Sequence, residues 1–505
     1  MFVRKLKNRG SGKTYVQVVS KDRGRYRVIK NIGNSDDDLI IENLISKGQQ
    51  WISRQSGIQE FAFGEERRSV EHFLDSITQL KLAGPDLLLG RLFDEIGFNK
   101  IKDPLFRHLV LYRLIYPKSK LKTTEYLSRY QQIFWDEDQV YRYLDKLYHS
   151  QKDLVQQISY NHTLKILEEG IQIVFYDVTT LYFEIDDQDD LRKTGFSKEG
   201  RHQNPQIVLG LLVSKNGYPL AYDIFEGNKF EGHTMLPVID AFKKKYDLQH
   251  LVIVADSGLL SSSNIEELCH KGYEFILGAR VKSESQKIKE KILSLQLSHG
   301  ESAIIKKGGL DLIVTYSDDR AKKDRYNREK GLRKLEKQIK TGRLTKSNIN
   351  NRGYNKYLKM EGEIKVVIDK EKFDQDGRWD GLKGYITNAK MSKKQILENY
   401  SHLWHIEKAF RVAKSELRIR PIFHRLQRRI EAHICLAFVA YKVYKELERQ
   451  LKIKKSEMSP TKAIEISQNI HEVTVQLPGS NNSVTKILLL TDEQKLLAKT
   501  FDFGC

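Results

Sequence analysis

Cysteine is scarce in this chain of 505 residues. The three cysteines, Cys269, Cys435 and Cys505, lie far apart and form no Cys-x-x-Cys pair. This pattern excludes a disulfide framework and a cysteine-based zinc site, and it is typical of a reducing cytoplasm. The basic N-terminus is followed by no apolar run, and no apolar stretch reaches about 18 residues, so we expect neither a secretory signal nor a membrane span.

Acidic residues are outnumbered by basic ones. The chain has 86 Lys and Arg against 66 Asp and Glu, a formal net charge of +20. Such an excess favours a polyanionic partner, and nucleic acid is the commonest large one, although a basic enzyme without such a partner is the alternative. Neither a G-x-S-x-G motif nor a Walker loop occurs, so no sequence motif supports acyl transfer or ATP hydrolysis as the activity.

One predicted helix, Ile396 to Leu417, carries three functional side chains at steps of seven residues. They are Tyr400, Glu407 and Lys414. Seven residues are almost two helical turns, so the three drift by only about 20° per step and share one face, with Arg411 beside them. The other side is apolar at helical spacing. A carboxylate between an aromatic hydroxyl and an ammonium suits phosphate chemistry.

Two aspartates follow predicted buried strands. Asp177 ends the apolar run 171–176, and Asp256 ends the run 251–255. Sites in open α/β sheets form at the carboxyl ends of strands, so both carboxylates are candidates for one site. A strand-end aspartate can also simply cap the next element.

The order strand-Asp, strand-Asp, helix-Glu resembles the DDE transposases of bacterial insertion sequences. In one large group of these enzymes the glutamate lies in a signature of Tyr, two residues, Arg, three residues, Glu, six residues, Lys. Tyr400, Glu407 and Lys414 fit this spacing, whereas Leu403 stands where Arg is expected. The phosphate contact of that Arg must be absent here or come from another residue, such as Arg411.

The resemblance covers roughly residues 171–444 and implies an α/β, ribonuclease H-like catalytic domain with a mixed five-stranded sheet. The element pattern agrees: apolar runs at 207–213 and 218–225 are joined by Asn216-Gly217, a strong hairpin signal. Helices at about 233–246 and 261–272 and a strand at 274–277 follow.

A segment of roughly 281–380 exceeds what the catalytic fold needs, so we expect a largely β insertion there. Its basic stretch, 320–346, could be a phosphate-tracking helix or only a solvated one. The mostly helical region 35–165 would recognise the element's ends or serve as a scaffold. The predicted parts are a basic β-hairpin region (1–34), a helical DNA-binding region (35–165), the catalytic domain in two parts (166–280 and 381–450), the insertion (281–380) and a C-terminal tail (451–505).

Three converging carboxylates repel each other unless a cation neutralises them. Carboxylate oxygens suit Mg²⁺ or Mn²⁺, and two such ions can hold the attacking and leaving oxygens of a phosphodiester displacement. The hypothesis is that Asp177 bridges two ions, while Asp256 and Glu407 each complete one.

Further side chains near Glu407 are candidates for DNA contact. Tyr400, Lys414 and Arg411 would position phosphate, and Trp404 could stack on an unpaired base or belong to the core. His402 and His405 lack the spacing of a zinc-binding HExxH helix, so they are interpreted as packing or DNA-contact residues.

The resemblance implies a transposase that binds its element's terminal inverted repeats and cuts and joins double-stranded DNA with divalent metal. A homodimer in a paired-end complex, in the bacterial cytoplasm and on the nucleoid when bound to DNA, is the expected state. Two alternatives stay open. One is a structure-selective nuclease on the same fold, and the other is a non-catalytic DNA-binding protein derived from a transposase.

Overall fold

The computed structural model describes residues 1–505 except 9–11, 23, 57–69, 198–199, 351–352, 363–364, 478–480 and 505. The chain forms two compact units. The small unit comprises 1–80 and 473–485, and the large unit comprises 81–472 and 486–505. Of the helices described, none combines the length and hydrophobicity needed to cross a bilayer.

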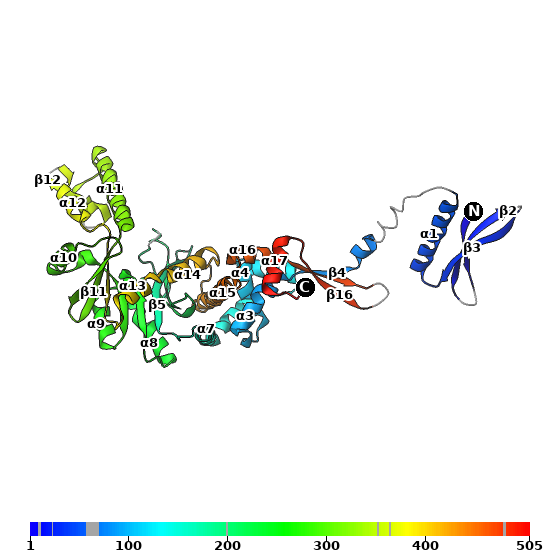
Figure 1. The fold of residues 1–505 in the computed structure, drawn as a ribbon, viewed down its shortest axis with the longest axis horizontal. Coiled ribbons are helices and arrows are strands. Elements are labelled where there is room, and N and C mark those ends of the chain that lie inside the picture. Colours follow the sequence, from blue (N-terminus) through cyan, green and yellow to red (C-terminus); the bar gives the residue numbers. More distant parts are fainter. Residues whose placement is uncertain are drawn as a thin grey trace. The chain divides into compact units, whose positions relative to one another are not determined.

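An eight-stranded mixed sheet is the centre of the large unit (Figure 1). Its strand order is β10-β11-β14-β9-β8-β5-β6-β7. The strands are β5 (Ile173–Tyr182), β6 (Gln206–Ser214), β7 (Pro219–Glu226), β8 (Val252–Ala255), β9 (Glu274–Ala279), β10 (Ser302–Lys307), β11 (Leu310–Tyr316) and β14 (Leu382–Thr387).

The predicted mixed α/β architecture is confirmed, but the sheet is larger than the five strands expected. The five predicted strands are neighbours in the order β7-β6-β5-β8-β9, with β5 antiparallel to β6 and parallel to β8. The antiparallel strand β14 then pairs with β9, and β11 and β10 follow it. Pairing with β14 satisfies the backbone N–H and C=O groups of β9, which would otherwise be unpaired at the edge of the sheet.

The insertion differs from the largely β prediction. It contains α10 (Gln286–Leu293), α11 (Asp318–Lys340), α12 (Lys370–Gly377) and a two-stranded sheet of β12 (Leu358–Glu361) and β13 (Lys365–Ile368). At 23 residues α11 is the longest of these elements. Its Leu335 and Ile339 pack into a small cluster with Tyr357 and Val366. The predicted basic helix is therefore present, while β10 and β11 belong to the main sheet.

Helix α15 (Gln427–Ile453) organises the remaining helices of the large unit. It is buried along most of its length, and the buried side chains include Lys442, Lys445, Glu446 and Glu448 as well as many apolar residues. It contacts α3 (Arg91–Ile96), α4 (Pro104–Ile115), α6 (Glu137–Ser150), α7 (Lys152–Ile166) and α16 (Pro460–Ser467). The helices α3 to α7, which include α5 (Lys120–Gln131), therefore share one hydrophobic core with strands β5 and β6 of the main sheet.

The small unit contains a three-stranded antiparallel sheet where a hairpin was predicted. Its strands are β1 (Phe2–Lys7), β2 (Thr14–Asp22) and β3 (Arg25–Ser35), and α1 (Asp38–Gln55) packs on them. The prediction missed β1 because its alternation is hidden among basic residues. A second sheet has the order β16-β15-β4, from β4 (Ile77–Leu82), β15 (His471–Gln476) and β16 (Ser483–Leu488).

An ion pair between α6 and α15 gives the large unit a pH-dependent contribution to stability. Arg429 donates to both oxygens of Asp145, at 2.8 and 3.0 Å, and these bonds, together with the ion pair from Arg428, lower the pKa of that carboxyl to about 2. Because the folded-state pKa lies below the unfolded value of about 3.9, the contribution is present above that value and is lost as pH falls toward 2.

We expect Asp145→Asn to lower the free energy of unfolding by about 1–2 kcal/mol above about pH 5, with the difference shrinking toward pH 2. Thermal unfolding of both proteins across this range measures the effect. Asp492→Asn, at a fully exposed carboxylate, is the control and should follow the wild type throughout. A difference for Asp145→Asn that stays constant down to pH 2 would contradict the assignment.

Candidate active site

Two of the three predicted acids lie side by side because of strand register. The parallel pairing of β5 and β8 joins Tyr176 to Ala255 as its last pair, and Asp177 and Asp256 are the next residues on each strand. Adjacent strands are about 4.8 Å apart, and residues at matching positions of parallel strands point to the same face. The register thus brings these two carboxylates together.

Asp177 does not end its strand, contrary to the prediction. The strand continues to Tyr182 because residues after Asp177 still pair with β6. Asp256 does follow β8 directly, and it caps a short 3-10 helix by accepting a hydrogen bond from the Ser257 N–H at 2.7 Å. Asp177 likewise accepts from the Val178 N–H at 2.8 Å. The capping alternative therefore describes Asp256 correctly, but it leaves the carboxylate exposed.

The predicted helix of residues 396–417 is two helices. Helix α13 (Lys393–Ser401) ends before His402, and α14 (Trp404–Ser415) begins after Leu403. Backbone bonds of the tighter i to i+3 type run through this junction, including Leu403 N to Tyr400 O at 3.1 Å. Tyr400 and Leu403 are both buried, so packing of the two side chains accompanies the break. Tyr400 therefore does not lie on one continuous helix with Glu407.

The Tyr400 side chain nevertheless reaches one of the predicted acids, Asp256. Its hydroxyl is 3.4 Å from Asp256 Oδ1, and it stands close to Gly278 of β9, where an added Cβ would lie 2.6 Å from it. Glycine at 278 thus makes room for the hydroxyl. Burial raises the pKa of Tyr400, and the charge of Asp256 raises it further, so the hydroxyl is protonated and can donate to the carboxylate.

Lys383 of β14 lies close to Tyr400 and interacts electrostatically with both Asp256 and Glu407. Its ammonium lies over the Tyr400 ring at 4.6 Å and over the Tyr385 ring at 5.2 Å. Burial lowers the pKa of Lys383, and Arg320 adds to this effect, whereas Asp256 and Glu407 both act to raise it. Glu407, which is exposed on α14, therefore shares one electrostatic neighbourhood with Asp256.

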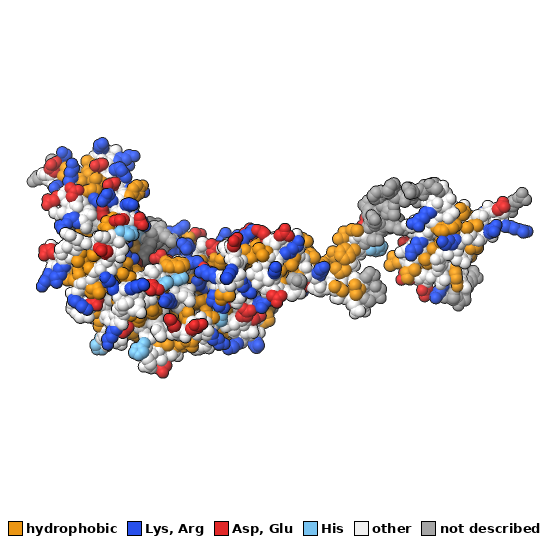
Figure 2. Space-filling model, in the orientation of Figure 1, with side chains coloured by type: hydrophobic (Ala, Val, Ile, Leu, Met, Phe, Trp, Pro, Cys, Tyr) orange, Lys and Arg blue, Asp and Glu red, His pale blue; other side chains and the backbone are white. Residues whose placement is uncertain are grey.

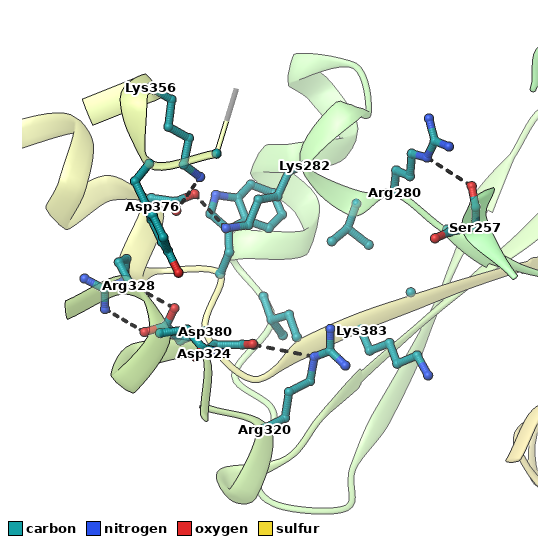
Figure 3. Close-up of a pocket in the computed structure, with 18 of the residues that line it drawn as sticks. Ser257, Arg280, Lys282, Arg320, Asp324, Arg328, Lys356, Asp376, Asp380 and Lys383 are labelled. Atoms are coloured by element: carbon teal, nitrogen blue, oxygen red, sulfur yellow. Dashed lines mark hydrogen bonds and ion pairs between the residues drawn. The ribbon is translucent and has the colours of Figure 1, made fainter. Parts of the chain in front are cut away.

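A cavity of about 680 Å³ adjoins this neighbourhood, between the insertion and strands β9 and β14 (Figure 3). Ser257 and Lys383 are among its lining residues. Six cations line it, namely Arg280, Lys282, Arg320, Arg328, Lys356 and Lys383.

Four of these six cations are paired with acids of the cavity wall. Lys282 and Lys356 bind Asp376, while Arg328 binds Asp380 and Arg320 binds Asp324. Arg280 instead donates to the carbonyl oxygens of Ser257 and Gly258. Within the described residues, Arg280 and Lys383 have no acid at ion-pair distance. Arg280 contacts Ser257, the residue after Asp256, and the charge of Asp256 acts on the pKa of Lys383.

The other predicted DNA-contact residues are more dispersed. Trp404 is 46% exposed and stacks on His405, so the structure favours the surface over the core for this ring. Arg411 is exposed on α14, and its charge acts on Tyr444 of α15. Lys414 is half-buried in the last turn of the same helix. Leu403 is buried in the main core.

Lys383 and Glu231 lie at the candidate site, and sequence reasoning missed both. Glu231 lies on a short 3-10 helix, and its Oε2 is 3.7 Å from where a Cβ at Gly258 would be, next to the Asp256 loop. Neither residue belongs to a motif. The one available signal was the position of Lys383 in a short strand just before the signature helix.

The carboxylate set suits a hard divalent cation in its chemistry. Within the described part of the chain, however, no three His, Cys, Asp or Glu side chains are grouped closely enough to hold a metal ion. The two aspartates are neighbours by register, whereas Glu407 approaches them through Lys383 and Tyr400. Lys383 thus adds a positive charge near Asp256 and Glu407.

Gly278→Ala tests the packing around Tyr400. The new Cβ would lie 2.6 Å from the Tyr400 hydroxyl and 2.9 Å from the Ser257 nitrogen. We expect a loss of about 1–3 kcal/mol in the free energy of unfolding, partly recovered when Tyr400→Phe removes the hydroxyl. Gly258→Ala, where the nearest atom is 3.7 Å away, is the control. Additive losses in the Gly278→Ala and Tyr400→Phe double variant would show that the hydroxyl is not the obstacle.

Comparison with known proteins adds a family relationship. Residues 168–442 match the family described as Transposase DDE domain. No curated protein matches the chain. A solved structure, the cryo-EM structure of a piggyBac transposase synaptic complex with hairpin DNA, is similar at 9% identity with a TM-score of 0.39, covering 72% of this chain and 69% of that chain.

Proposed function

The chain belongs to the transposase DDE domain family, and from this premise we propose that it cuts and joins DNA at the ends of a bacterial insertion sequence. Its substrates would be the element's terminal inverted repeats and a target duplex. The observation that supports this best is the register of β5 and β8, which sets Asp177 beside Asp256. A net charge of +20 agrees with a DNA partner.

The proposed catalytic core is ribonuclease H-like. The supporting observation is the order β7-β6-β5-β8-β9, in which three antiparallel strands are followed by two parallel ones. The strands from the insertion and β14 would be additions to this core.

Asp177, Asp256 and Glu407 are the residues that would hold Mg²⁺ or Mn²⁺, as two ions. When bound, the ions supply charge stabilisation for the attacking and leaving oxygens. In the first step a water oxygen bonds to phosphorus and the element's 3′ oxygen leaves as a hydroxyl. In the second step that hydroxyl attacks a target phosphate and displaces the target's 3′ oxygen.

The protein's own side chains would orient the phosphates. Tyr400 holds Asp256 by its hydroxyl, and Lys414, Arg411 and Trp404 are proposed DNA contacts on α14. We assign to Lys383 the cationic role that Arg has in the family signature, because Leu403 is buried and Lys383 lies beside Tyr400, Asp256 and Glu407. Such charge-assisted contacts to phosphate are among the stronger hydrogen bonds.

The expected working state is a homodimer on paired DNA ends, acting on the nucleoid in the bacterial cytoplasm. The helices α3 to α7 are proposed to support the catalytic core, since they pack with α15.

The first test is cleavage and joining of DNA that carries the element's own end, with Mg²⁺ or Mn²⁺. We expect Glu407→Gln to lose cleavage by a factor of about 100 or more while DNA binding persists, because a metal ligand is removed without a change of shape. Joining of a labelled end to a plasmid separates a transposase from a nuclease.

Glu398→Gln, on exposed α13 surface, is the matched control and should cut as the wild type does. Normal cleavage by Glu407→Gln would show that the three-acid site is wrong. Cleavage without joining by the wild type would favour the nuclease, and binding alone would favour the non-catalytic protein.

Lys383→Ala tests whether Lys383 takes the cationic role that Arg has in the family signature. We expect end cleavage to fall about 10-fold or more, with a smaller change in DNA affinity, because one charge-assisted phosphate contact is lost. Lys356→Ala removes a cation from the same cavity that is already paired with Asp376 and should change cleavage less. Equal losses in both variants would assign the effect to the cavity's overall charge.

A further inference from the structure

The three-stranded sheet of the small unit has one covered face and one open face. The covered face carries Val16 and Val18, which are buried, and Val3, which lies against Gly48 of α1. On the opposite face the side chains are linked by contacts with one another. These residues are Phe2, Arg4, Gln17, Lys21, Tyr26 and Asn31.

The open face combines polar and basic groups with an apolar patch, in which Val19 is buried next to Phe2. Arg4 and Lys21 both lie over the Tyr26 ring, at 4.8 and 5.5 Å, and the ring itself is 52% exposed. Gln17 Nε2 donates to Asn31 Oδ1 at 2.6 Å in an exposed position. Each amide keeps further donors or acceptors for another partner. The face thus presents a guanidinium, an ammonium and two amides on a rigid sheet.

The sheet as a whole is strongly basic. The strand β1 carries three Lys or Arg, β2 carries one and β3 carries three, against the single acid Asp22. By register Arg4 and Lys21 lie on the open face, Lys30 lies over the Trp51 ring of α1 on the covered side, and the two edge strands carry six of the seven cations. Figure 2 shows Lys and Arg side chains beside hydrophobic ones on the visible face of this unit. A surface of one sign with exposed aromatic and amide groups is complementary to a polyanion that also offers base edges.

We propose that this open face reads the sequence of the element's end from the major groove of duplex DNA, an inference that rests on the proposed function. Neighbouring strands are about 4.8 Å apart, and the major groove, about 12 Å wide, admits two adjacent strands of such a sheet. Arg pairs with guanine and Asn or Gln with adenine in that groove, and β-sheet readers of DNA are known. Arg4, Gln17 and Asn31 are the base-reading residues, and the basic rim holds phosphates.

The experiment selects bound DNA from a pool of duplexes with a randomised core, using the full-length protein. Affinity for the enriched sequence and for a scrambled one is then measured at several salt concentrations. Gln17→Ala/Asn31→Ala tests base reading, and Arg25→Ala/Arg27→Ala tests phosphate contact. Lys47→Ala/Arg54→Ala removes the same number of charges from exposed sites on α1 and is the matched control.

Gln17→Ala/Asn31→Ala should reduce the preference for the enriched sequence about 10-fold or more with little loss of general affinity. Arg25→Ala/Arg27→Ala should weaken binding to all sequences and reduce the salt slope by about 2, whereas the control stays close to the wild type. Arg25, Arg27 and Asn31 are exposed and Gln17 is half-buried, and equal thermal midpoints verify that the variants fold.

An unchanged preference in Gln17→Ala/Asn31→Ala, with a wild type that discriminates, would overturn this inference and leave the proposed function intact. A wild type that enriches no sequence would instead contradict end recognition itself. Tighter binding to RNA than to duplex DNA would overturn the choice of partner.

Discussion

The parallel pairing of β5 with β8 is the constraint around which the candidate site is arranged. It fixes Asp177 and Asp256 on adjacent strands, where their charges repel. Backbone N–H groups of Val178 and Ser257 each donate to one carboxylate, and the Tyr400 hydroxyl adds a third contact. Lys383 then adds a positive charge from β14. The Val178 N–H thus stabilises the charge of Asp177, and the other groups stabilise the charge of Asp256.

The elements that the sequence predicted well are those with a strong local signal. The strands at 171–176, 207–213, 218–225 and 251–255 are short apolar runs bounded by turn residues, and all are present in β5 to β8. The long apolar helix from Gln427 is present as α15. The two aspartates were found for the same reason, since each directly follows such a run. Local pattern is sufficient where burial on both faces of a strand dictates it.

The features that the sequence did not predict depend on contacts between distant segments. The break between α13 and α14 accompanies the packing of Tyr400 and Leu403, which heptad spacing alone does not reveal. Lys383 reaches Asp256 only because β14 pairs with β9. Glycine is needed at position 278 because a side chain there would collide with the Tyr400 hydroxyl. Three further strands join the sheet because β9 offers an edge, and no periodicity in the sequence specifies that partner.

Burial of α15 has a consequence for shortened copies of this gene product. The family-matched segment ends at residue 442, yet α15 continues to Ile453, and its core partners include helices before residue 168 and after residue 455. A truncated copy that kept only the matched segment would expose a wide apolar surface in place of those partners. Such a fragment would aggregate, so it would not compete with the intact protein as an inhibitor.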